Sequence, residues 1–150
     1  MESQELVRWM RQEHRKVEDI ARELRERVAG VPRTGLDGWI GGLRQQFEHI
    51  RAHLHKHVAL EEHDGYMAEV LVRRPMLSNE IDRLQHEHAE FARLMDGIRQ
   101  AIENLTPADR LLIRDCCQRI NDFLSYIEHH EAHENLIAVA VFTHDIGTED

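Results

Sequence analysis

The segment from His53 to His63 reads HLHKHVALEEH, and it holds four histidines and two glutamates in eleven residues. The apolar residues that lead into it recur in steps of four and three, which is typical of the buried face of a bundle helix. They are Leu36, Ile40, Leu43, Phe47, Ile50 and Leu54. The same spacing, continued, lands on His57 and Glu61, which a helix places on one face about 6 Å apart.

An imidazole and a carboxylate on the buried face of a helix need partners, because burying either group without one is costly. A metal ion is a partner that suits both groups. The alternative is a hydrogen-bonded polar layer that fixes the register of the bundle, but buried carboxylates are an unfavourable means to that end. We therefore interpret His57 and Glu61 as metal ligands.

The composition predicts an all-α fold. Pro (3) and Gly (8) are scarce among the 150 residues, and runs of β-branched residues are nearly absent. A chain of this length is long enough for one domain with a real core and too short for two comfortable ones. We therefore expect a single domain over residues 1–150.

The charge and the cysteines exclude several classes of protein. A net charge of −9 weighs against a nucleic-acid or anionic-membrane partner. Cys116 and Cys117 are adjacent, which argues against a disulfide framework or a thiolate zinc site. The charged N-terminal stretch does not resemble a signal peptide, and no apolar run reaches the roughly 18 residues of a membrane span. We expect a cytoplasmic protein.

Four long helices are predicted. The first covers about residues 3–29 and the second about 36–63, while the third and fourth begin at Pro75 and Pro107. Residues 66–74 are expected to form a short helical or irregular crossover between the second and third helices.

Two capping signals and a tail complete this prediction. Residues 34–37 read Thr-Gly-Leu-Asp, which predicts a capping box for the second helix. Residues 106–109 read Thr-Pro-Ala-Asp, which predicts a cap for the fourth helix with proline at its first position. Residues 147–150 are expected to fray.

An internal repeat relates two halves of the chain, which we expect to form helical hairpins over about 3–63 and 75–142. In each half the first helix carries a Glu-His pair and the second a His-x3-Glu pair. The four motifs are Glu13-His14, His57-x3-Glu61, Glu87-His88 and His130-x3-Glu134. Two such hairpins would form an antiparallel up-down-up-down four-helix bundle with six inward polar groups.

The repeat carries one inconsistency in length. Counted back from the turn, His14 and His57 differ in height by about 10 Å at the rise of an α-helix. We therefore expect the second helix of each hairpin to overhang the first.

Four imidazoles and two carboxylates are more donors than one structural zinc ion takes, since zinc normally has four ligands. They suit two ions that share both carboxylates. Mixed imidazole and carboxylate donors favour iron or manganese over magnesium or calcium.

These motifs resemble those of the hemerythrin-like, or HHE cation-binding, domains, and the resemblance covers nearly the whole chain. It implies two non-haem iron ions with an oxo or hydroxo bridge, although another divalent metal is an alternative. In the roles that it implies, four histidines are terminal ligands and two glutamates bridge the ions. These residues are His14, His57, His88, His130, Glu61 and Glu134.

The sequence departs from the oxygen-carrying hemerythrins at Ala92, where they have a further histidine. The symmetric version with four histidines and two glutamates is the closer match. His53 lies one turn before His57, and its counterpart in the repeat is Tyr126. Either residue could support the ligands or occupy a spare coordination position, or form a partly exposed helix flank.

The resemblance implies a function with a small partner: binding, sensing or reducing dioxygen, nitric oxide or peroxide. The alternatives are iron delivery or handling, and a structural or regulatory bundle that holds another divalent metal. If the protein is an enzyme, we expect slow peroxide or nitric oxide chemistry, but the sequence does not identify catalytic residues. Neither the oligomeric state nor a protein partner follows from the sequence.

Overall fold

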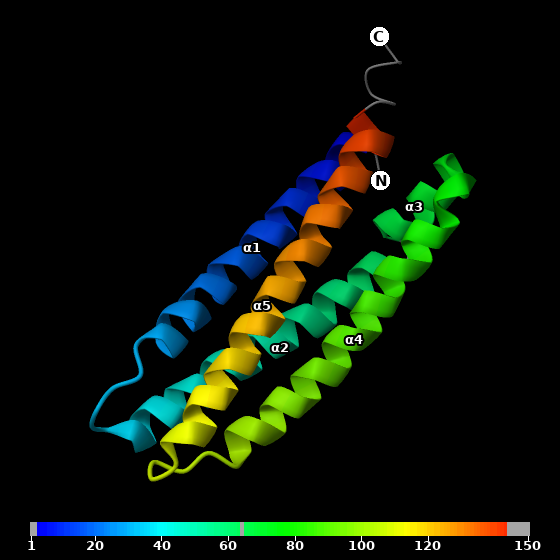
Figure 1. The fold of residues 1–150 in the computed structure, drawn as a ribbon. Helices are drawn as coiled ribbons and strands as arrows, with labels where there is room; N and C mark the ends of the chain where they lie inside the picture. The colour runs from blue at the N-terminus through cyan, green and yellow to red at the C-terminus, as the bar shows by residue number, and fades with distance from the viewer. Residues whose placement is uncertain (1–2, 64, 144–150) are drawn as a thin grey trace.

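The fold is known from a computed structural model, which describes residues 3–63 and 65–143 (Figure 1). Four long helices dominate it, and two short helical turns and one short helix complete the described chain. The α-helices are α1 (Ser3–Ala29), α2 (Leu36–Glu62), α3 (Tyr66–Arg73), α4 (Ser78–Glu103) and α5 (Arg110–Ala138). A 3₁₀ turn spans Pro75–Leu77 and a π-helical turn spans Val139–Thr143. The all-α prediction is confirmed.

The four long helices pack as a bundle in which each has two neighbours. Helices α1 and α4 each contact both α2 and α5. In Figure 1 the α1–α2 and α4–α5 connections lie at one end of the bundle, and α3 lies at the other. Among the described residues, no helix has the length and apolar character needed to cross a membrane.

The buried faces follow the predicted spacing. In α4 the buried residues recur in steps of three and four, as a packed helix requires. They are Ile81, Leu84, His88, Phe91, Met95, Ile98 and Ile102. In α1 a stripe from Leu6 to Val28 is buried with the same spacing, and His14 lies inside it.

The capping box predicted for α2 is wrong, whereas residues 106–109 do cap α5 but without Pro107 as its first residue. Helix α2 has Gly35 at its N-cap with a φ of 71°, and no side chain caps it. This left-handed conformation suits glycine, which has no Cβ. Helix α5 begins at Arg110 after Asp109, whose carboxylate accepts a hydrogen bond from the Leu112 amide at 3.0 Å. Pro107 lies in the turn before the helix.

The predictions for the segments between and after the long helices have different outcomes. The predicted crossover is confirmed as α3, and Pro75 opens a 3₁₀ turn that leads into α4. The predicted fraying of residues 147–150 falls outside the described residues. At the end of the bundle that holds the α1–α2 connection, α2 begins beyond the point where α1 ends (Figure 1). This is the overhang that was predicted for the first hairpin.

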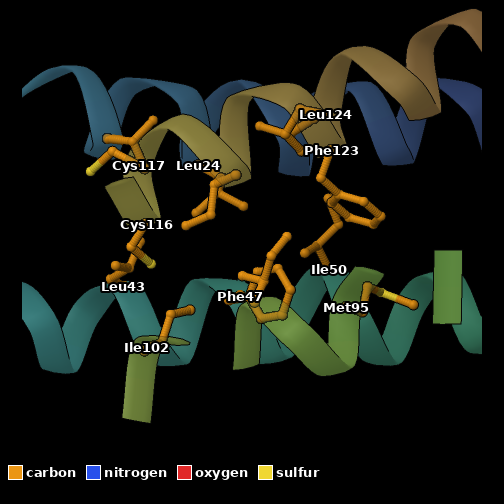
Figure 2. Packing of buried hydrophobic residues seen from close by; sticks show 14 of the residues in the cluster. Leu24, Leu43, Phe47, Ile50, Met95, Ile102, Cys116, Cys117, Phe123 and Leu124 are labelled. Carbon is orange, nitrogen blue, oxygen red and sulfur yellow. The ribbon is translucent and has the colours of Figure 1, made fainter. Parts of the chain in front are cut away.

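The core contains two apolar clusters. The loop-end cluster consists of the buried apolar residues of 17–28, 36–54, 91–105 and 113–127. Figure 2 shows part of it, with side chains such as Leu24, Phe47 and Phe123 pointing into the space between the helices. The terminal-end cluster consists of the buried apolar residues of 6–10, 66–70, 81–84 and 137–142.

A layer of buried polar residues separates the two clusters on all four long helices. We call it the polar layer, and its members are Glu13, His14, His57, Glu61, His88, His130, Glu131 and Glu134. In α1, for example, Met10 belongs to one cluster and Val17 to the other, with His14 between them. The fold therefore places charged and titratable groups at a depth where they need partners.

Candidate metal centre

The structure brings together the six residues that the sequence predicted as metal ligands. Helices α1 and α4 each contribute one histidine, and α2 and α5 each contribute a His-Glu pair one turn apart. They are His14, His57, Glu61, His88, His130 and Glu134. None is more than 4 % exposed, and both carboxylates are completely buried.

The four imidazoles present Nε2 to the two carboxylates. On one side, Nε2 of His14 lies 3.1 Å from Glu134 Oε1, and Nε2 of His57 lies 3.1 Å from Glu61 Oε1. On the other side, Nε2 of His88 lies 3.2 Å from Glu61 Oε1, and Nε2 of His130 lies 3.4 Å from Glu134 Oε1. The donor atoms therefore converge on one small volume.

These donors fall into two groups that share both carboxylates. Glu61 and Glu134 combine with His14 and His57 in one group, and with His88 and His130 in the other. Within each group the candidate ligand atoms lie within 4.8 Å of one another. Two imidazoles and two carboxylates form a donor set suited to iron, zinc or manganese. Each group could hold one metal ion.

Several buried polar atoms of the centre have no hydrogen-bond partner among the described residues. They are both ring nitrogens of His57 and both carboxylate oxygens of Glu61. In the second group, the Nε2 atoms of His88 and His130 lie 3.0 Å apart. Two unprotonated imidazole nitrogens at this distance repel each other, so the contact is favourable only when a proton or a cation lies between them. The arrangement therefore fits bound cations.

The two carboxylates have opposite proton affinities. Burial raises the pKa of Glu61 well above its usual range, and the neighbouring charge of Glu134 raises it further. Burial also opposes ionisation of Glu134, but hydrogen bonds from His130 and His14 outweigh it and hold this pKa well below its usual range. A carboxylate pair of this kind keeps one proton when no cation neutralises it.

A second set of residues lies around the four histidines and faces their Nδ1 atoms. The Nδ1 atoms of three histidines lie within hydrogen-bond distance of outer acceptors, and a neutral ring that donates from Nδ1 presents an unprotonated Nε2 to a metal ion. The bonds are His14 to Asn135 at 2.8 Å, His88 to Glu62 at 3.1 Å and His130 to Glu87 at 2.8 Å. The fourth, His57, has Glu13 at 3.5 Å from Nδ1, without a hydrogen bond.

The two candidate supporting residues lie in different places. His53 stacks on His57 with ring centres 6.4 Å apart, and its Nε2 lies 3.7 Å from Glu13. Tyr126 packs on Phe91, which in turn packs on His130 with ring centres 4.8 Å apart. His53 is thus next to a candidate ligand, whereas Phe91 lies between Tyr126 and the centre.

Tyr66 is a functional candidate that sequence reasoning missed. It is fully buried at the start of α3, and its hydroxyl donates a hydrogen bond to Oε2 of Glu134. Burial raises the pKa of this hydroxyl well above its usual range, and the charge of Glu134 raises it further. The available signal was a tyrosine in the crossover, five residues after Glu61, where a polar tip could reach a buried site.

The remaining histidines lie outside the centre. His49, His55, His63, His86 and His129 are exposed. His133 is half-buried, with Nε2 2.9 Å from Glu80 Oε2. His144 lies outside the described residues.

Comparison with known families gives one match. A family model described as "Hemerythrin HHE cation binding domain" matches residues 5–142. The comparison with curated proteins found no match, and the comparison with solved structures found none either.

Proposed function

Because the chain belongs to the family of hemerythrin HHE cation-binding domains, we propose that it holds two non-haem iron ions and uses them to bind, sense or reduce dioxygen, nitric oxide or peroxide. The observation that carries this proposal is the pair of donor groups that share Glu61 and Glu134. The proposed architecture is the antiparallel up-down-up-down bundle, which the two connections at one end of Figure 1 support.

The proposed ligand roles follow the two donor groups. His14 and His57 would be terminal ligands of one ion, and His88 and His130 of the other. Glu61 and Glu134 would bridge the ions, because each carboxylate belongs to both groups. When bound, such a pair supplies coordination positions and electrons to a small oxidant.

The chain's own residues would orient the ligands and supply a proton. Asn135, Glu62 and Glu87 accept hydrogen bonds from three of the histidines and so fix their ring orientation. Tyr66 holds a proton on its hydroxyl next to Glu134, at a depth that bulk water does not reach. This proton is the one that we propose for reduction of an oxidant.

Iron delivery is the second candidate function. The observation that favours it is that His14 lines an open cavity between α1 and α5, so one side of the centre is close to solvent. A protein that delivers iron must exchange its metal ions, whereas a reductase must retain them. The two functions therefore differ in how readily iron leaves the protein.

Iron analysis and spectroscopy test the leading proposal. After anaerobic loading with ferrous iron, we expect two iron ions per chain, and new near-ultraviolet absorption when oxidant is added. Binding of one ion or none would overturn the proposed pair of ions.

A pair of tyrosine variants tests the proposed proton source. We expect Tyr66→Phe to slow peroxide consumption by about 10²-fold, the usual scale for loss of a positioned acid. Tyr126→Phe is the matched control, because Phe91 separates Tyr126 from the centre. Stable, reversible gas binding without turnover in the unmodified protein would instead favour a sensor or carrier.

A further inference from the structure

We propose that the two metal positions are unequal: the position held by His88 and His130 binds its ion tightly, and the position held by His14 and His57 binds more weakly and exchanges its ion with solvent. This inference rests on the proposed two-ion function. It concerns which ion can leave, and three features of the structure support it.

The first feature is the set of outer residues that contact the Nδ1 atoms of the four histidines. Glu13, from the first hairpin's Glu-His motif, lies next to His57, and its repeat counterpart Glu87 bonds to His130. The residue after each proposed bridging glutamate instead contacts a histidine of the other hairpin. Glu62 bonds to His88, and its repeat counterpart Asn135 bonds to His14. The repeat therefore predicts a glutamate at 135, and the chain has an amide there.

This replacement weakens the support of one ligand only. A carboxylate that accepts a hydrogen bond from Nδ1 makes the imidazole a better electron donor to a metal ion, and a neutral amide does so less. Glu131 does not replace the missing carboxylate, since its Oε2 lies 3.9 Å from His14 Nδ1, beyond hydrogen-bond distance.

The second feature is the weaker hold on His57. Glu13 lies 3.5 Å from His57 Nδ1, and that nitrogen makes no hydrogen bond among the described residues. The same carboxylate accepts a hydrogen bond from Lys16 at 3.2 Å. Its counterpart Glu87 makes a bond of 2.8 Å to His130. Both histidines of one position therefore have weaker outer partners than both histidines of the other.

The third feature is access. Two cavities of about 430 and 320 Å³ lie between α1 and α5, and both are lined by Glu18 and Asn135. His14 lines the smaller one. At the other position Phe91 packs against both His88 and His130, whereas at this one Trp9 stacks on His57 alone. The weaker position is thus also the one with a route to solvent.

Anaerobic titration of the full metal-free chain with cobalt(II) tests the inference, because the absorption of bound cobalt reports each binding step. We expect two steps, the first at least about tenfold tighter, since outer partners change metal affinity by about 10- to 100-fold. His14→Ala should keep the tight step and lose the weak one, and His88→Ala should lose the tight step. Two equal steps, or loss of the tight step in His14→Ala, would overturn the inference.

Variants that keep every ligand make the test independent of damage to the fold. Asn135 is exposed, and Asn135→Asp restores a carboxylate, so it should tighten the weak step about tenfold. Asn121→Asp adds the same charge nearer the start of α5, outside the polar layer, and should leave both steps unchanged. Glu87→Gln should weaken only the tight step. A weak step unaffected by Asn135→Asp counts against the inference, whereas a wild-type protein that binds fewer than two cobalt ions refutes the two-ion function itself.

Discussion

The loop-end cluster and the polar layer are built on the same four helices with the same spacing, yet they are stabilised in different ways. In the loop-end cluster, Leu24, Leu43 and Phe47 are at most 1 % exposed, and burial of each contributes about 1.5–3 kcal/mol. In the polar layer, Glu61 and Glu134 are equally buried, and burial opposes the ionisation of both. One helix face can therefore stabilise the fold in one region and depend on a bound cation in the next.

This contrast assigns different tasks to the two regions. The apolar cluster should set the stability of the bundle whether or not metal is present. The polar layer should set metal content, and its stability should change with metal and with pH. Substitutions in each region can separate the two tasks.

The largest expected effect is on metal content. Glu61→Ala removes a carboxylate that belongs to both donor groups, so bound metal should fall from two ions to one or none. Elemental analysis of the purified variant measures this. Glu48→Ala, in the same helix but at a surface ion pair with Arg51, is the control and should keep both ions. Normal loading of Glu61→Ala would show that this carboxylate does not bridge.

The second effect is on stability alone. Phe47→Ala leaves a cavity in the loop-end cluster and should lower the free energy of unfolding by about 3–5 kcal/mol. Urea denaturation measures the loss, and metal analysis of the folded variant should still find both ions. A folded variant that has lost its metal would show that the two regions do not act separately.

The third effect is that of removing the metal. Chelation should lower the free energy of unfolding by about 3 kcal/mol for an ion supplied at a hundred times its dissociation constant. Acid should also release the metal, because an imidazole must be neutral to act as a ligand. Thermal unfolding with and without chelator measures the difference. Equal melting temperatures would mean that the polar layer is satisfied without a cation.

The contrast between the two regions also explains what could be predicted from the sequence. The inward positions of His14, His57, His88 and His130 follow from helical periodicity, which is a local property. The repeat then indicated that they share one depth with Glu61 and Glu134, and the structure brings all six together.

Other features depend on the relative placement of helices, which periodicity does not specify. The contact of Glu13 with His57 and that of Glu62 with His88 both cross between helices, so they depend on how far α2 is shifted along its neighbours. Tyr66 reaches Glu134 because α3 packs against the ends of α1, α4 and α5 in the terminal-end cluster. The cap of α2 was missed because Gly35 adopts a left-handed conformation that needs no side-chain bond.

The smallest expected effect concerns Glu131, a member of the polar layer that belongs to neither donor group. Burial raises its pKa from 4.5 to about 8, and the charge of His14 only partly offsets this. The folded state therefore holds a proton that the unfolded state has lost between these two values, so this residue makes the protein less stable as pH rises from about 4.5 to 8.

Glutamine at this position cannot ionise, so Glu131→Gln should remove that pH dependence. At pH 8 the metal-free variant should be more stable than the wild type by about 1–3 kcal/mol, and near pH 4.5 the two should unfold alike. Urea denaturation at both pH values measures the difference. Glu128→Gln, at an exposed ion pair with Arg25, should change stability by less than about 1 kcal/mol at either pH. If Glu131→Gln gains nothing at pH 8, then His14 already compensates this carboxylate, and the unfavourable burial in the polar layer is confined to the residues that would bind metal.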